Sequence, residues 1–362
     1  MAIISFPPMN KKTILFILFI FISILSISIP YIFDGIPPYE IDLLDCICQI
    51  AITIPYFIKN FPKKEIVEET LLEFSKKDLI IFCLVLFINL LDMTIYVMYD
   101  ETLNFIEGLY NRYNIEMFLL ILLSIYASNL GYYKHHYIGI VIFTIFSSLV
   151  DYFIFTNRED NLNFDWKHIT LSTLDWILES IIITYKKYLM DEKKFTPYSV
   201  CLCFAFFNLI FIFILFVLKL FTPNPICLDG NCLDLFEFDT SVFTNNISLV
   251  FSIIISIICI LFYFFFYYQI LYNYTSSHVL LAYYIPLIAS NFESFIDLDA
   301  EILEWVIFVL SIVFILIGLL IYLEIIELNF CNLSDNIRRN LEKVGEIGIE
   351  SKSEENEESN KE

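Results

Sequence analysis

The chain has 362 residues, of which 58% are hydrophobic, and its mean hydropathy is +0.72. This composition excludes a soluble domain of the same length, and continuous rather than alternating apolar runs argue against a β-barrel. The formal net charge of −21 at pH 7 disfavours nucleic acid as a partner. We therefore predict an all-α, polytopic membrane bundle of about ten transmembrane helices, with the lipid bilayer as its surroundings.

Apolar runs of membrane-spanning length recur along the whole chain. We expect spans over residues 13–33, 41–58, 78–99, 115–130, 137–155, 168–188, 200–221, 247–271, 278–296 and 302–325. The first follows Lys11 and Lys12 and lacks a cleavage site, which favours a retained anchor helix over a signal peptide. Residues 100–113 are expected to form a loop or the start of the next helix. Residues 331–362 have the composition of a disordered acidic tail.

Basic residues are distributed unevenly between the two sides of this expected bundle. The side that holds both termini carries most of them, and the opposite side keeps only Arg112, Arg158, Lys167 and Lys219. The positive-inside rule therefore places both termini in the cytosol, with the protein in an endomembrane or the plasma membrane.

Ten spans divide naturally into two sets of five. An odd number of spans inverts the second copy relative to the first, which is a common arrangement in transporters. The sequence thus predicts a five-helix repeat over residues 1–160, a second over 161–330, and the tail over 331–362.

The sixth expected span carries two carboxylates, Asp175 and Glu179, near its centre. They are spaced i, i+4 and share one helix face, with Lys186 on the same face at the expected cytosolic interface. No Lys or Arg lies at the middle of any expected span, so two neighbouring carboxyls in a low dielectric are not expected to be ionised together. Such a site suits a proton, a cation or a neutral polar ligand. A structural hydrogen bond to a neighbouring helix is the alternative.

Further polar residues interrupt other spans: Asp92, Asn208, Asn291 and Glu293. If they converged with Asp175 and Glu179, they would line a site for substrate or coupling ion. Taken singly, each is as well explained by a contact between helices.

Cys227 and Cys232 flank the sequence LDGN in a loop on the non-cytosolic side, where a turn would allow a disulfide. Most of the other cysteines lie in apolar runs and are interpreted as small buried hydrophobes. No spacing of Cys or His suggests a metal site, and we expect no cofactor.

Two stretches carry a resemblance to a known family: LESIIITYKKYLMDEKKFTPYSVCLCFAFFNLIF, over 178–211, and YLEIIELNFCNLSDNIRRN, over 322–340. The first joins an acidic and aromatic helix end to a basic turn with proline and an apolar helix. Together with the ten-span layout, they resemble the drug/metabolite transporter superfamily, in particular its nucleotide-sugar-transporter-like members. A carrier of such anions is expected to have central Lys or Arg, so the resemblance implies the fold without that substrate class.

These observations predict a secondary transporter that moves a small polar solute by alternating access, with a proton as a candidate coupling ion. The competing interpretation is a non-transporting receptor or scaffold with a transporter-like fold. An enzyme is not expected, because the chain has only four His and no evident catalytic set.

Overall fold

The computed structural model describes residues 4–5, 18, 38–60, 75–107, 112–128, 134–157, 166–221, 226–228, 231–233, 247–280, 302–323 and 326–328. Its helices are α2 (Pro38–Asn60), α4 (Lys76–Glu107), α5 (Arg112–Ser128), α6 (Lys134–Asn157), α7 (Trp166–Asp191), α8 (Pro197–Phe221), α10 (Ile247–Asn273) and α12 (Ile302–Tyr322). Its strands are β1 (Ile4–Ser5), β2 (Ile226–Leu228), β3 (Asn231–Leu233) and β4 (Glu327–Leu328), which pair antiparallel as β1–β4 and β2–β3.

These helices coincide with expected spans, so the helical class is confirmed. Helix α4 extends to Glu107, and thus residues 100–107 continue a helix instead of forming a loop. The expected spans 13–33 and 278–296 lie almost wholly outside the described residues, as does the acidic tail. The number of spans therefore stays a prediction.

The chain forms two compact units. The smaller unit comprises Met1–Met9, Leu130–Arg158 and Asp297–Glu362, and the larger comprises Asn10–Asn129 and Glu159–Ile296. Both units draw on both halves of the sequence. The predicted repeats divide the chain at residue 160, whereas each compact unit contains elements from before and after that residue. The units therefore do not test the repeats.

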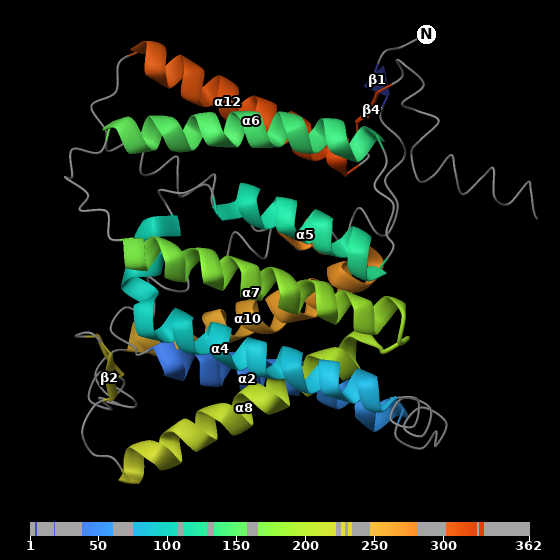
Figure 1. The fold of residues 1–362 in the computed structure, drawn as a ribbon, viewed down its shortest axis with the longest axis vertical. Helices are drawn as coiled ribbons and strands as arrows, with labels where there is room; N and C mark the ends of the chain where they lie inside the picture. Colours follow the sequence, from blue (N-terminus) through green and yellow to red (C-terminus); the bar gives the residue numbers. More distant parts are fainter. Residues whose placement is uncertain are drawn as a thin grey trace, which may run out of the picture. The chain divides into compact units, whose positions relative to one another are not determined.

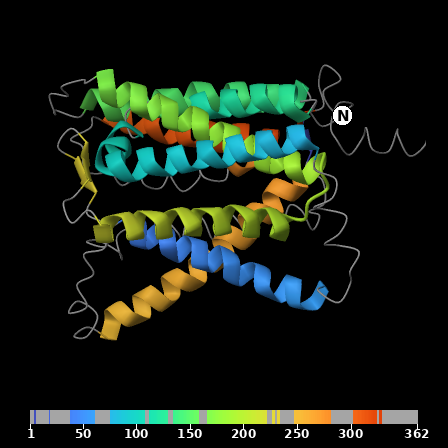
Figure 2. The ribbon, with the colours of Figure 1, turned by 60° about the horizontal axis from the view of Figure 1, so that its bottom comes forward.

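In the larger unit, α7 packs against α4 and α5, while α2 packs against α8 and α10 (Figure 1). Figure 2 shows α10, in orange, crossing α2, in blue. Lesser contacts of α7 and α4 with α8, and of α7 with α10, connect these groups of helices. The larger unit is therefore a helical bundle in which α7 reaches four neighbours.

In the smaller unit, α6 and α12 lie side by side (Figure 1). His136 meets Tyr322 near one end, with ring centroids 5.0 Å apart, and Phe146 stacks on Phe314 at 4.4 Å further along. Residue numbers rise along one helix as they fall along the other, so the pair is antiparallel.

Two glycines mark the place where α6 and α12 cross. A Cβ built on Gly139 would lie 2.7 Å from the carbonyl oxygen of Gly318, and one built on Gly318 would lie 2.9 Å from the carbonyl oxygen of Gly139. Since these neighbours are backbone atoms, no side chain can move aside to make room. Close approach of two helix backbones is the reason small residues recur in membrane helix contacts.

Local sequence defines the ends of the helices that carry the site. Ser75 caps α4, because its Oγ accepts from the backbone N–H of Asp78 at 3.1 Å while Asp78 Oδ2 accepts from the N–H of Ser75 at 3.2 Å. Thr196 caps α8 in the same way through the N–H of Ser199, and Pro197 takes the first helical position as the sequence predicts.

The turn after α7 closes that helix with a left-handed residue. The N–H of Phe195 donates to the carbonyl of Leu189 at 3.0 Å, and Lys194 has φ 57°. This is the geometry of a Schellman end, in which the residue after the helix is usually glycine. Residues 192–196 thus join α7 to α8 in a short, hydrogen-bonded connection.

Within the described ranges, four helical segments are long and apolar enough to cross a membrane: Lys76–Ile95, Pro197–Val217, Ile254–Asn273 and Ile302–Tyr322. Large apolar side chains are exposed along them, among them Phe213 and Ile255. Exposure of this kind suits contact with lipid and not with water. The fold is therefore compatible with a multi-pass integral membrane protein.

Candidate functional site

Helix α7 differs from these four segments because it combines a spanning length of 26 residues with ionisable side chains along one face. Asp175 is buried, with 3% of its surface exposed, and Glu179 one turn later is half-buried. Both predicted residues therefore point into the larger unit. Charged residues within such a helix are costly in lipid unless other helices surround them.

Lys186 lies on the same helix, seven residues after Glu179, and aromatic rings surround its ammonium group. Its Nζ lies 4.8 Å from the ring centre of Phe204, 5.6 Å from that of Tyr267 and 5.8 Å from that of Tyr268. These rings come from α8 and α10. An ammonium over an aromatic face within about 6 Å is attracted by the negative face of the ring.

The same ammonium interacts electrostatically with the carboxyls of Glu179 and Asp92. The sequence predicts Lys186 at the interface and no cation beside Asp175 and Glu179; in the structure its ammonium lies within electrostatic range of Glu179. Seven residues correspond to about 10.5 Å along a helix, and helical side chains point back toward the N-terminus, so a lysine reaches most of that way. Lys186 is thus within electrostatic range of Asp92 on α4 and of Glu179 on α7, both predicted as site residues.

Tyr267 extends the group to a further helix. Besides Glu179, it interacts electrostatically with Glu116 of α5, a carboxyl whose exposed fraction is 0%. We call the Lys186 cluster the set formed by Lys186, its three rings and these carboxyls: Asp92, Glu116, Glu179, Lys186, Phe204, Tyr267 and Tyr268. Its members come from α4, α5, α7, α8 and α10.

The rings of the Lys186 cluster are held firmly. Tyr267 and Tyr268 meet at an interplanar angle of 81°, with centroids 5.0 Å apart, so their planes stand nearly at right angles. Tyr268 donates from its hydroxyl to Oε1 of Gln49 at 3.3 Å. The thiol of Cys201 donates to the carbonyl of Gln49 at 3.6 Å. Helix α2 therefore supports the aromatic wall from behind.

A second polar row follows α7 at positions 176, 180 and 184, which lie on one face of the helix. The indole Nε1 of Trp176 and the hydroxyls of Ser180 and Thr184 are buried, and they find no hydrogen-bond partner among the described residues. Buried donors of this kind normally have a partner, because leaving one unpaired costs about 1–3 kcal/mol. The row therefore offers hydrogen bonds to a bound molecule or to water.

Other predicted site residues have different places. Asn208 of α8 accepts through Oδ1 a hydrogen bond from Nδ2 of Asn89 on α4, so its amide joins two helices. Asn291 and Glu293 lie outside the described residues. In the β2–β3 hairpin, Cys227 is directly opposite Cys232 in the register, and the disulfide stays a prediction.

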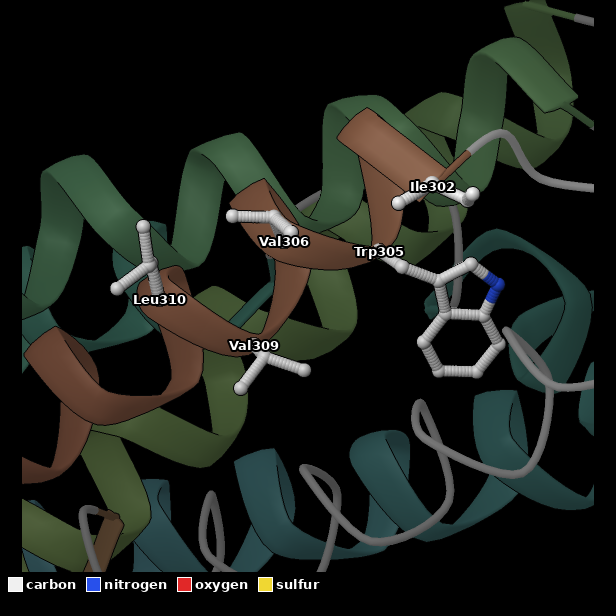
Figure 3. A pocket seen from close by; sticks show the side chains of 5 residues that line it. All are labelled: Ile302, Trp305, Val306, Val309 and Leu310. Atoms are coloured by element: carbon white, nitrogen blue, oxygen red, sulfur yellow. The ribbon is translucent and has the colours of Figure 1, made fainter.

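A hollow on the surface of α12 offers no comparable chemistry. Ile302, Trp305, Val306, Val309 and Leu310 line it, and all project from this single helix (Figure 3). Val306 and Val309 are each about half exposed. An open apolar surface on a helix of spanning length suits contact with lipid chains.

Glu116, Phe204 and the tyrosine pair of α10 were not predicted as site residues. Glu116 belongs to a spacing, with Leu120 and Ser124, that repeats every four residues and gives the buried face of α5. That period is a signal the sequence does contain. The tyrosines lie in the run FYFFFYYQ, where their neighbours are equally aromatic and nothing marks them out.

The fold and the site are those of a helical protein, compatible with a multi-pass membrane protein, with an ionisable cluster between its helices. No family model matches the sequence, and no curated protein matches it. Twenty-two chains of solved structures match the fold. One of them, described only as "Crystal structure of protein", aligns with 86% of this chain and 96% of its own length, at 11% identity and a TM-score of 0.54. At that identity, the similarity concerns the fold alone.

Proposed function

We propose that the protein is a secondary transporter that carries a small polar solute across a membrane by alternating access. The observation that carries the proposal is the Lys186 cluster. Five helices bring three carboxyls, one ammonium and three rings together inside an apolar bundle. Burying such groups opposes folding unless they pair, and membrane proteins retain them mainly along solute and ion pathways.

The unpartnered row of Trp176, Ser180 and Thr184 supports the same proposal. It supplies neutral hydrogen-bonding groups beside the acidic face of α7. Solute sites in membrane transporters combine such groups with a few charges, since a polar solute must exchange its water for protein contacts. A proton shared by Asp175 and Glu179 is the proposed coupling ion.

The proposal includes ten spans arranged as two inverted five-helix repeats, the architecture that the resemblance to the drug/metabolite transporter superfamily implies. Helices α6 and α12 correspond to the fifth and tenth expected spans, so they occupy equivalent places in the two halves. Their antiparallel course and the reciprocal contact of Gly139 with Gly318 support a two-fold relation between the halves. In this arrangement both termini are cytosolic.

The test is uptake into proteoliposomes across a panel of radiolabelled small solutes. The double variant Asp175→Asn, Glu179→Gln should reduce uptake of the accepted solute at least about tenfold, because it removes the groups that take up the proton. Glu192→Gln is the matched control, since it removes an exposed carboxyl just beyond α7. Undiminished uptake by the folded double variant would remove these two residues from the mechanism. Absence of uptake by the wild type across the whole panel would favour the receptor or scaffold interpretation.

A further inference from the structure

Lys186 is held in an unusual way for a half-buried lysine. No hydrogen bond or ion pair joins its Nζ to any residue that the structure describes, and its close contacts are the faces of Phe204, Tyr267 and Tyr268. Part of the side chain stays accessible. An ammonium has three donors, and leaving them without acceptors is costly away from water.

The neighbouring lysine shows the contrast within one helix. Lys187 has a buried side chain, and its Nζ donates to the carbonyl of Tyr272 at 3.1 Å and pairs with Asp191 at 3.0 Å. That is how a structural lysine is stabilised, with oxygen acceptors around its donors. Lys186 instead has the surroundings that proteins use to bind methylated ammonium ions, which have no donors to satisfy.

From these contacts we infer that Phe204, Tyr267 and Tyr268 form a binding site for an organic ammonium ion, and that Lys186 occupies it as a tethered cation until the solute displaces it. The inference rests on the proposed transport function and names the substrate class of that site. A trimethylammonium group has no N–H to lose hydrogen bonds, so it fits an aromatic site better than the lysine does.

The charges around the rings favour a cation in the same way. The carboxyls of Asp92 and Glu179 interact electrostatically with Lys186, and those of Glu116 and Glu179 with Tyr267. Carboxyl groups around the rings favour an arriving cation over an arriving anion. When Lys186 leaves the rings, its ammonium stays within electrostatic range of Glu179 and Asp92.

The rings are also prepared to receive a ligand. Phe204, Tyr267 and Tyr268 are each less than 10% exposed, and Tyr268 is fixed by its hydrogen bond to Gln49. The ring planes of Tyr267 and Tyr268 are nearly perpendicular, so a cation can contact two aromatic faces at once. A site formed before binding loses little conformational entropy when the ligand arrives.

The experiment measures choline binding to the full chain in detergent micelles by isothermal titration calorimetry. Lys186→Ala removes the side chain that lies between the rings, and with it the ammonium that competes with the ligand. This variant should therefore bind choline at least about tenfold more tightly than the wild type. Lys186→Arg keeps a tethered cation and should resemble the wild type. Lys193→Ala, which removes a lysine charge outside the cluster, is the control and should also leave the affinity unchanged.

Ring variants and a neutral ligand complete the test. In the Lys186→Ala background, Tyr267→Leu should weaken choline binding at least about fivefold. The neutral isostere 3,3-dimethyl-1-butanol, which has the shape of choline without its charge, should bind much more weakly. Lys186→Gln repeats the main comparison with a polar chain, in case the alanine variant is not monodisperse.

Three results would overturn the inference: an affinity for choline that does not rise in the folded Lys186 variants, equal binding of choline and its neutral isostere, or binding of inorganic phosphate that is lost with Lys186. Uptake of radiolabelled choline into proteoliposomes separates the two proposals. Binding without uptake retains the site and removes the transporter. Uptake of another solute without choline binding retains the transporter and removes the site.

Discussion

The two compact units solve the problem of packing helices in different ways. In the smaller unit, α6 and α12 meet at Gly139 and Gly318, where the backbones themselves are in contact and a ring pair lies on either side. In the larger unit, the helices around the Lys186 cluster contribute carboxyls, an ammonium and tyrosines. The first arrangement leaves no space for a ligand, and the second contains polar groups that require partners.

This difference indicates where stability and function are located. Close backbone packing gains van der Waals contact at every atom and tolerates no extra volume. A buried charged cluster opposes folding, so its presence favours a functional role. Under the proposed function, the glycine crossing serves stability and the Lys186 cluster serves solute handling, and substitutions in each unit test this division.

The largest effect is expected at the glycine crossing. Gly139→Leu should destabilise the protein by about 3 kcal/mol or more, because its side chain would overlap the backbone of Gly318 and Tyr322. Thermal unfolding in detergent measures the loss, and Gly318→Leu should match it since the contact is reciprocal. Val141→Leu, at an exposed position of the same helix, serves as the control. A leucine at either glycine that leaves the unfolding temperature unchanged would refute the tight crossing.

A smaller effect is expected for the amide pair between α4 and α8. Asn89→Leu should cost about 1–2 kcal/mol, because Asn208 then loses its partner in a partly buried place. The double variant with Asn208→Leu should recover part of that loss, since no amide is left unpaired. Additive losses in a double-mutant cycle would show that the hydrogen bond contributes nothing to stability.

The hydrogen bond between the hydroxyls of two serines should contribute still less to stability. Ser124 and Ser276 share a buried hydrogen bond of 2.8 Å, and Ser124→Ala should cost about 0.6 kcal/mol, as is typical of such bonds in membrane proteins. Chemical unfolding of both single variants and the double variant gives the coupling. A coupling of about 3 kcal/mol or more would mean that polar contacts stabilise the larger unit as strongly as glycine packing stabilises the smaller one.

The smallest effect is a gain in stability. Lys194 adopts φ 57° after α7, a conformation that glycine adopts without strain. Lys194→Gly should therefore raise stability by about 0.5 kcal/mol, after the greater freedom of glycine in the unfolded chain is subtracted. Lys193→Gly, at the preceding position, is the comparison, and a greater gain there would exclude the left-handed turn as the cause.

The sequence predicts the helices well because their apolar runs and end signals are local. Pro197 begins α8 where the chain requires a helix start, and the spans over 137–155 and 200–221 agree with α6 and α8 to within a few residues. The sequence singles out Asp92 and Glu179 as polar residues inside expected spans. Their shared interaction with one ammonium depends on side-chain reach and on the packing of α4 against α7, which no local pattern specifies.

The surroundings of Lys186 show most clearly what the sequence alone does not predict. From the sequence, a lysine near the end of a span is an interface residue, since lysines usually extend toward the headgroups. Its partners Phe204, Tyr267 and Tyr268 lie 18, 81 and 82 residues later, among many similar aromatic residues. Only the arrangement of α7, α8 and α10 selects these three rings from the others.

The short turn at residues 192–196 has a mechanical consequence. Lys186 and Phe204 lie on the two helices that this turn joins, so a short, hydrogen-bonded connection links the ammonium to one of its rings. Tyr267 and Tyr268 belong to α10, which hydrogen bonds tie to the same region: Lys187 donates to the carbonyl of Tyr272, and Tyr268 and Cys201 both donate to Gln49. A motion of α7 and α8 away from α10 would therefore have to break these hydrogen bonds as well as the ring contacts.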